Sequence, residues 1–200
     1  LFKWVAPDEQ GNRQGSYAPV ILLITPKKQQ LVSVGADYAI SDRTSVSTEI
    51  AASSYNINSF SKRDKGDDIG YALKLKLNDQ RSLKGSKKGL ELYSRLSYEW
   101  VQDRFKPVER LRDVEFSRRW GLPLNGLGNA NEGLMQAEVE LKSVRGNTIR
   151  YQFENYNRSD GYQGIRNGIR YRADYGQWHL NNQLDITSFD LRDQQGYYLK

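Results

Sequence analysis

The chain has 200 residues, a formal net charge of +6 and no cysteine, which excludes disulfide bonds, thiolate nucleophiles and zinc–thiolate sites. Its 30 basic residues are interspersed with 24 acidic ones, whereas a dedicated nucleic-acid binder usually segregates its charge. No stretch of the sequence approaches the roughly 18 consecutive apolar residues that identify a transmembrane helix.

The N-terminal part of the chain, residues 1–30, is predicted to be a separate segment or a first strand. It contains one continuous apolar run, from Val20 to Ile24, which lies between Pro19 and Pro26. Proline fixes φ and cannot donate to a β-ladder, so the two prolines delimit this short run.

From residue 31 onward, apolar residues recur at every second position, and almost never at the helical period of about 3.6. In residues 90–100, for example, Leu92 and Leu96 share one face while Glu91 and Arg95 share the other. The longer stretches have roughly nine to eleven residues, the length that a tilted strand needs to cross a bilayer. Further strands are predicted at residues 31–40, 44–52, 71–77, 135–142, 149–154, 166–175 and 178–186, with a last one around Tyr197.

Three short turns fix the register of neighbouring strands, because residues that face each other across an antiparallel ladder lie on the same face. Gly176 suits the first position of a two-residue hairpin turn, and Gly146 the left-handed position of a three-residue turn. The third turn is the polar segment of residues 41–43. The resulting register places Val34 opposite Ile50, Val139 opposite Tyr151, Glu140 opposite Arg150, and Asp174 opposite His179.

The remaining connections are predicted to include three long, polar loops, at residues 53–68, 102–133 and 155–164. They alternate with the short turns, which puts every long loop at the same end of the sheet. A soluble β-sandwich has no reason for this asymmetry, whereas a transmembrane β-barrel has short turns on one side of the membrane and long loops on the other. The predicted fold is therefore all-β: an antiparallel up-and-down meander of about 8–10 long strands over residues 31–200, forming a transmembrane β-barrel or part of one.

The two faces of the predicted strands differ in chemistry. One is apolar with aromatic residues near its ends, such as Tyr38 and Trp178, which fits the aromatic girdles of a membrane barrel and also the core of a sandwich. The other carries charges of both signs, which would line the interior of a barrel or face solvent in a sandwich. The predicted interior charges are Glu91, Arg95, Glu99, Glu138, Glu140, Arg150, Glu154, Arg170, Arg172 and Asp174.

The longest loop contains the segment FKPVERLRDVEFSRRWGL, at residues 105–122. This segment and the strand pattern around it resemble large outer-membrane β-barrel proteins of Gram-negative bacteria, and the resemblance covers most of residues 31–188. It implies a location in the bacterial outer membrane, contact with the lipid bilayer and lipopolysaccharide, and a structural, anchoring or transport role. Such barrels commonly end on an aromatic residue, whereas Lys200 is last here, so both a barrel and a part of a larger barrel stay as alternatives.

Five arginines of this loop could bind lipopolysaccharide phosphates or another anionic ligand through bidentate hydrogen bonds. Acidic residues such as Asp113 and Glu115 are interleaved with them, so a loop whose charges pair with one another is the favoured alternative. A helical turn is also predicted within residues 108–120. The five arginines are Arg104, Arg110, Arg112, Arg118 and Arg119.

The sequence predicts neither catalysis nor a cofactor. His179, the single histidine, is expected to pair with Asp174 across a hairpin rather than to activate a serine nucleophile. No glycine-rich phosphate loop follows a strand, and no metal-ligand spacing is present. The alternative to a membrane barrel is a soluble antiparallel β-sheet module, in the periplasm or at the cell surface, that recognises a polysaccharide or a protein through its charged face and loops. A nucleic-acid partner is not expected.

Overall fold

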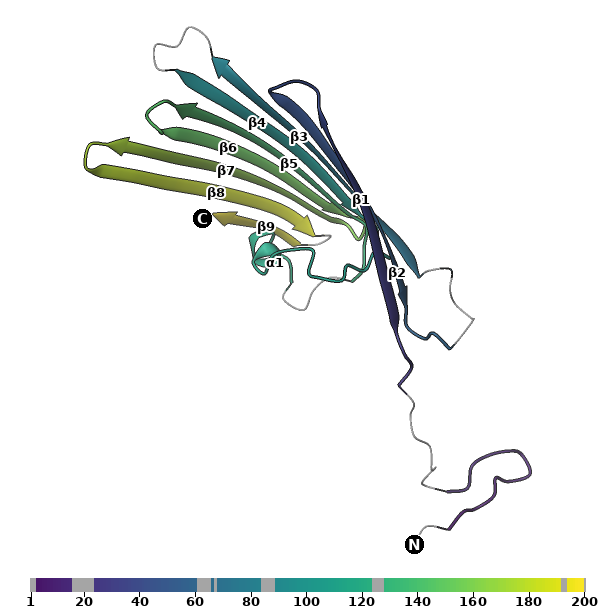
Figure 1. The fold of residues 1–200 in the computed structure, drawn as a ribbon. Helices are drawn as coiled ribbons and strands as arrows, with labels where there is room; N and C mark the ends of the chain where they lie inside the picture. The colour runs from purple at the N-terminus through teal and green to yellow at the C-terminus, as the bar shows by residue number, and fades with distance from the viewer. Residues whose placement is uncertain are drawn as a thin grey trace.

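The computed structural model describes residues 3–15, 24–60, 66, 68–83, 89–123, 128–191 and 194–199. They form a nine-stranded antiparallel sheet in which each strand pairs with the next one along the chain (Figure 1). The strands are β1 (Lys28–Ala39), β2 (Thr44–Asn56), β3 (Ile69–Leu83), β4 (Leu90–Val101), β5 (Glu132–Ser143), β6 (Thr148–Arg158), β7 (Tyr162–Tyr175), β8 (Trp178–Leu191) and β9 (Gln194–Leu199). The sheet is not closed, because β1 and β9 each have a single neighbour.

This architecture confirms the predicted all-β meander of long strands. The strands β1 to β8 have 11 to 15 residues each, against an average of about 5–6 in globular proteins. The helix α1 (Phe116–Arg119) lies in the β4–β5 loop, within the range where a helical turn is predicted. In the part of the chain that the structure describes, no helix is long and apolar enough to be a candidate for spanning a membrane.

The register predicted from the three short turns is confirmed. The Ile40 amide donates to the Thr44 carbonyl over 2.9 Å at the first turn. Gly146 and Gly176 have φ angles of 86° and 60°, which glycine adopts without the steric cost of a side chain. The predicted pairs are all present: Val34 with Ile50, Val139 with Tyr151, Glu140 with Arg150, and Asp174 with His179.

The described residues before the sheet, 3–15 and 24–27, contain no strand. Most of the predicted first apolar run, residues 20–23, lies outside the described residues. The sheet begins at Lys28, slightly before the boundary that was predicted after residue 30.

Two of the three predicted long loops are present. Residues 57–68 join β2 to β3, and residues 102–131 join β4 to β5. Both are somewhat shorter than predicted, because β2 and β5 extend into the polar sequence of the first and the second loop, respectively. We call the second of these connections the β4–β5 loop.

The long loop predicted at residues 155–164 is wrong. β6 and β7 continue into this range, with Tyr156 opposite Gly164, so that only residues 159–161 remain as a turn. The polar composition of this stretch was misleading because the period of two persists through it. The aromatic rings of Tyr156 and Tyr162 are buried on one face of the sheet, which holds both strand ends in the ladder.

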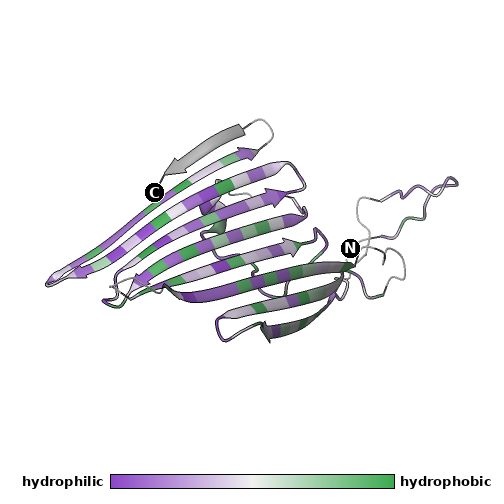
Figure 2. Ribbon diagram, turned by 90° about the horizontal axis from the view of Figure 1, so that it is seen from above, coloured by the Kyte–Doolittle hydropathy of each residue, from purple (hydrophilic) through white to green (hydrophobic). Residues whose placement is uncertain are grey.

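Hydrophilic and hydrophobic residues alternate along the strands (Figure 2). We call the side of the sheet that carries Leu96 and Leu184 the apolar face, and the opposite side, which carries Arg95 and Asp185, the charged face. No described element covers the apolar face, so these residues form a single layer and not two packed sheets. The main buried cluster lies on the charged face, where the β4–β5 loop packs, and comprises Phe116, Trp120, Leu134, Tyr156 and Tyr162.

Candidate functional site

The apolar face carries a continuous band of exposed hydrophobic side chains across β1 to β8. Each of these side chains is at least 37% exposed, although the same residue types usually form a protein core. We call this set the apolar band. Its members are Val32, Val34, Tyr38, Ile50, Tyr71, Leu75, Leu77, Leu96, Tyr98, Met135, Val139, Ile149, Tyr151, Ile165, Ile169, Trp178, Leu180, Leu184 and Ile186.

The apolar band runs obliquely to the rows of the β-ladder. On β1, Tyr38 is the band residue nearest the short turn, and the band extends from it toward the long-loop end. On β8, Ile186 is the band residue nearest the long-loop end, and the band extends toward the short turn. Both residues belong to one ladder row, so between β1 and β8 the band shifts by about one residue per strand on average, although Leu83 at the short-turn end of β3 is also exposed on this face. The row connects them through Val46, Leu77, Leu96, Ala137, Phe153 and Asn167.

Several polar residues lie on the apolar face, and some of them are hydrogen-bonded, whereas Asn182 lies within the band between Leu180 and Leu184 on β8. Asp79, at the short-turn end of β3, accepts hydrogen bonds from Thr44 Oγ1 at 2.7 Å and from Arg81 Nε at 2.8 Å. Within the band, Asn167 accepts a hydrogen bond of 2.7 Å from the Tyr151 hydroxyl. The strand predicted here ended at residue 77, so Asp79 was not expected within β3, which extends to Leu83.

The ten charges predicted for a barrel interior all lie on the charged face, as the register shows. Most of them have partners on a neighbouring strand. Arg95 lies 2.7 Å from Glu138, and Arg150 Nε donates to Glu140 over 2.6 Å. Arg170 and Arg172 instead donate to the amide oxygens of Gln183 and Asn181, at 2.7 Å and 3.4 Å, and the Tyr93 hydroxyl donates to Glu91 at 2.6 Å.

Further charges on this face were not predicted as interior residues. Arg166 lies 3.1 Å from Glu154 and 3.2 Å from Asp185, so it bridges β6 and β8 from β7. Arg158 lies 2.8 Å from both Glu132 and Asp160. The sequence patterns missed Arg158 because it was placed in the supposed loop at residues 155–164, although it follows Tyr156 by two residues on the same face and so continues the period of two.

The β4–β5 loop lies across the charged face and is anchored near β1 to β3. The Lys106 amide donates to Ser53 Oγ over 2.8 Å, and Gln29 Nε2 donates to the carbonyls of Lys106 and Pro107 over 3.1 Å. A Cβ atom at Gly70 would lie 2.2 Å from the Phe105 nitrogen, so only glycine allows the loop backbone to approach β3 this closely.

The other anchor of the loop is on β7. The Tyr162 hydroxyl donates to the Trp120 carbonyl, and the Trp120 side chain is 1% exposed. A Cβ atom at Gly164 would lie 2.8 Å from the indole ring of Trp120. The loop therefore runs along the charged face from β3 to β7. Close packing holds it at both of these anchors.

The five loop arginines do not share one environment. Arg112 contacts Glu99 and Glu132, with 3.2 Å to the latter, and its guanidinium lies 4.9 Å from the Phe116 ring centre. Arg118 lies 3.1 Å from Glu115 and Arg119 lies 2.5 Å from Asp113. Arg104 donates to the Gly66 carbonyl at 3.4 Å, and Arg110 is exposed. Pairing within the loop is thus present for Arg118 and Arg119, whereas Arg112 pairs with carboxylates of β4 and β5.

Catalytic geometry is not evident in the described residues. His179 Nδ1 lies 2.7 Å from Asp174 Oδ1, as the register predicted, and both side chains are exposed beside the β7–β8 turn. Within the described ranges, no group of three or more His, Asp or Glu side chains is arranged to hold a metal ion. The distinctive features of the molecule are therefore its two faces and the loop that crosses one of them.

Comparison with known proteins adds no relative. No family model, no curated protein and no solved structure matches the chain.

Proposed function

We propose that this sheet is part of the wall of a transmembrane β-barrel in a bacterial outer membrane. In this proposal the apolar face contacts lipid and the charged face lines the barrel interior. The sequence resemblance to outer-membrane barrels and the uncovered apolar band support the same assignment. A contiguous exposed band on eight strands is more than the few hundred Å² of apolar patch that monomeric soluble proteins usually tolerate.

The slant of the apolar band is the observation that carries the proposal. A hydrocarbon layer requires a band of constant height, and strands that are tilted in the membrane meet that layer at successively shifted residues. A rise of about 3.4 Å per residue and a strand spacing of about 4.8 Å convert a shift of one residue per strand into a tilt of about 35°. Membrane barrels have strand tilts of about 35–45°.

The height of the apolar band supports the same assignment. On β8 it extends from Trp178 to Ile186, which is about 27 Å along a strand. Projected at a tilt of about 35°, this length corresponds to about 22 Å, close to the apolar belt of about 25 Å on membrane barrels.

The free edges of the sheet add a requirement to the proposal. Unpaired backbone groups in hydrocarbon cost several kcal/mol each, so open sheet edges do not persist in a bilayer. We therefore propose that further strands pair with β1 and with β9 and close the barrel.

The charged face and the β4–β5 loop bear on the role of such a barrel. Ion pairs between neighbouring strands cover part of the charged face. The β4–β5 loop packs against the same face and does not extend away from the end of the sheet. We propose a structural or anchoring role, with transport limited to small polar solutes that pass the loop.

Extraction from membranes tests the proposed function. A membrane barrel should require detergent for extraction and should migrate differently on a gel before and after heating. A chain that remains monodisperse in aqueous buffer without detergent would instead support a soluble binding module, and its binding to polysaccharides would then be the next experiment.

A further inference from the structure

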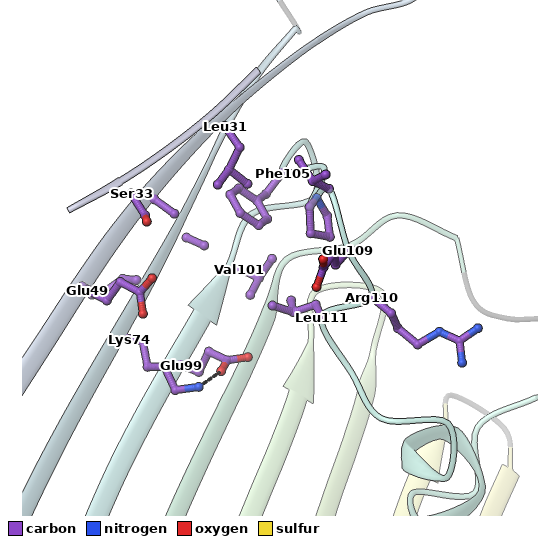
Figure 3. A pocket seen from close by; sticks show the side chains of 15 residues that line it. Leu31, Ser33, Glu49, Lys74, Glu99, Val101, Phe105, Glu109, Arg110 and Leu111 are labelled. Carbon is purple, nitrogen blue, oxygen red and sulfur yellow. Dashed lines mark ion pairs between the residues drawn. The ribbon is translucent and has the colours of Figure 1, made fainter. Parts of the chain in front are cut away.

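A cavity of about 470 Å³ lies on the charged face, between the β4–β5 loop and strands β1 to β4 (Figure 3). Its volume is within the range of about 300–1,000 Å³ that small-molecule sites usually have. Apolar side chains form much of its wall, among them Leu31, Val101, Phe105 and Leu111. This wall differs from the ion-paired surface that covers the same face of β5 to β8.

Three neighbouring rows of side chains on the charged face explain why a cavity forms at this place. The β4–β5 loop packs on the first row, through the Ser53 hydroxyl and the close approach at Gly70. The second row carries small side chains, which leave space beneath the loop. The third row is charged and borders the cavity on its other side. The rows consist of Leu31, Ser53 and Gly70; of Ser33, Ala51 and Ala72, with Val101 as the wall on β4; and of Gly35, Glu49, Lys74 and Glu99.

The polar part of the cavity lining includes three carboxylates and two basic side chains. Lys74 Nζ lies 3.1 Å from Glu99, which also contacts Arg112 of the loop, so Glu99 is paired with two basic residues. No ion pair is formed by Glu49 or Glu109 with the other described residues. Arg110 also lines the cavity, but its side chain points away from the other lining residues (Figure 3). The cavity thus combines apolar walls with the carboxylates of Glu49 and Glu109, although Lys74 is the ladder neighbour of Glu49.

We propose that this cavity binds a hydrophobic organic cation, an amine or quaternary ammonium with an apolar body about the size of a phenyl group. The apolar body packs on Ala51 and Ala72 beneath Phe105, and the cationic group lies beside Glu49. Gly35, the neighbour of Glu49 on β1, has no side chain that would obstruct this approach. Because the cavity is on the face opposite the apolar band, this inference does not depend on contact of the apolar face with lipid.

Binding of benzyltrimethylammonium to the full chain tests the inference. Calorimetric titration in a neutral detergent should show binding that benzoate, an anion with the same ring, does not show. Glu49→Gln removes the negative charge at nearly constant volume, and should weaken binding about fivefold, as expected for an exposed charge pair. Glu91→Gln, at the short-turn end of the same face, should leave the affinity unchanged.

A second variant distinguishes the cavity from other sites. Ala72→Leu fills the floor of the cavity and should abolish binding, and Ser33→Leu, which fills the same row from β1, should do the same if Ala72→Leu fails to fold. Absence of binding to the unmodified chain would overturn the inference. So would binding that persists in both floor variants, because the probe would then lie in the detergent micelle or on the apolar face.

Discussion

The position of a residue along its strand decides which side of the sheet its side chain occupies. On β5, Val139 is a member of the apolar band, whereas Gln136 faces the other side and donates a hydrogen bond to Glu154 over 2.6 Å. The two positions are only three residues apart, so they offer a matched pair for testing what each face contacts.

Substitution of these two residues by arginine should have opposite consequences. Val139→Arg should lower the folding free energy in phosphatidylcholine vesicles by about 2–4 kcal/mol, because it places a charge near the middle of the hydrocarbon layer. Gln136→Arg should change it by less than about 1 kcal/mol, since that position is on the charged face, within hydrogen-bond distance of the Glu154 carboxylate. Urea titration in vesicles measures both values. Equal, small effects would indicate that Val139 faces water, where surface substitutions change stability by about 0.5 kcal/mol or less.

The β6–β7 turn contains a carboxylate whose titration reports on the local structure. The hydrogen bond from Arg158 is the main cause that holds the pKa of Asp160 below its usual value of 3.8. The folded state therefore gains stability from this group above about pH 4, and loses it as the pH falls through the lowered pKa. An NMR titration of the Asp160 carboxyl carbon should give a midpoint below 3.8, and Arg158→Gln should raise it. An unchanged midpoint in Arg158→Gln would show that the contact does not form.

At the scale of strands and turns, the sequence contained enough information for the meander and its register. Gly146 and Gly176 identify two turns through their backbone freedom, and the period of two then assigns each side chain to a face. The end of β6 was not predictable from composition, because Asn155 and Asn157 are typical loop residues. What decides the structure there is the packing of Tyr156 against the β4–β5 loop, which is a contact between distant parts of the chain.

The position of the β4–β5 loop was likewise not predictable. Its charge pattern indicated self-pairing, which Arg118 and Arg119 confirm, but nothing local showed that the loop would lie on the charged face. Gly70 and Gly164 are the residues that allow it, and their role becomes visible only when a close approach of another segment is known.

Truncation of Trp120 should release the β4–β5 loop from the sheet. Trp120→Ala removes a buried ring and should cost about 3–5 kcal/mol in local packing, so trypsin should cleave faster after Arg118 and Arg119. Val108→Ala is the control, because Val108 is exposed in the same loop and contributes little packing. Equal cleavage rates in the two variants would mean that the ring does not hold the loop in place.

At the scale of the whole molecule, the sheet is one layer with two unlike faces and two free edges. A soluble module would have to expose the apolar band to water, whereas a bilayer solvates it and requires both edges to be paired. The slant of the band connects the single strand with the whole sheet. From one strand to the next the band shifts by about one residue on average, and such a shifted band lies at constant height in a membrane only when the strands are tilted.

The most direct test is therefore whether the apolar band contacts hydrocarbon. The chain has no cysteine, so an environment-sensitive fluorophore can be attached at a single introduced cysteine. In reconstituted vesicles, a fluorophore at Leu184→Cys should be quenched by lipids brominated on their acyl chains, and one at the adjacent Gln183→Cys, on the charged face, should not. Quenching of the Leu184→Cys fluorophore by aqueous iodide, with no response to brominated lipid, would contradict the account.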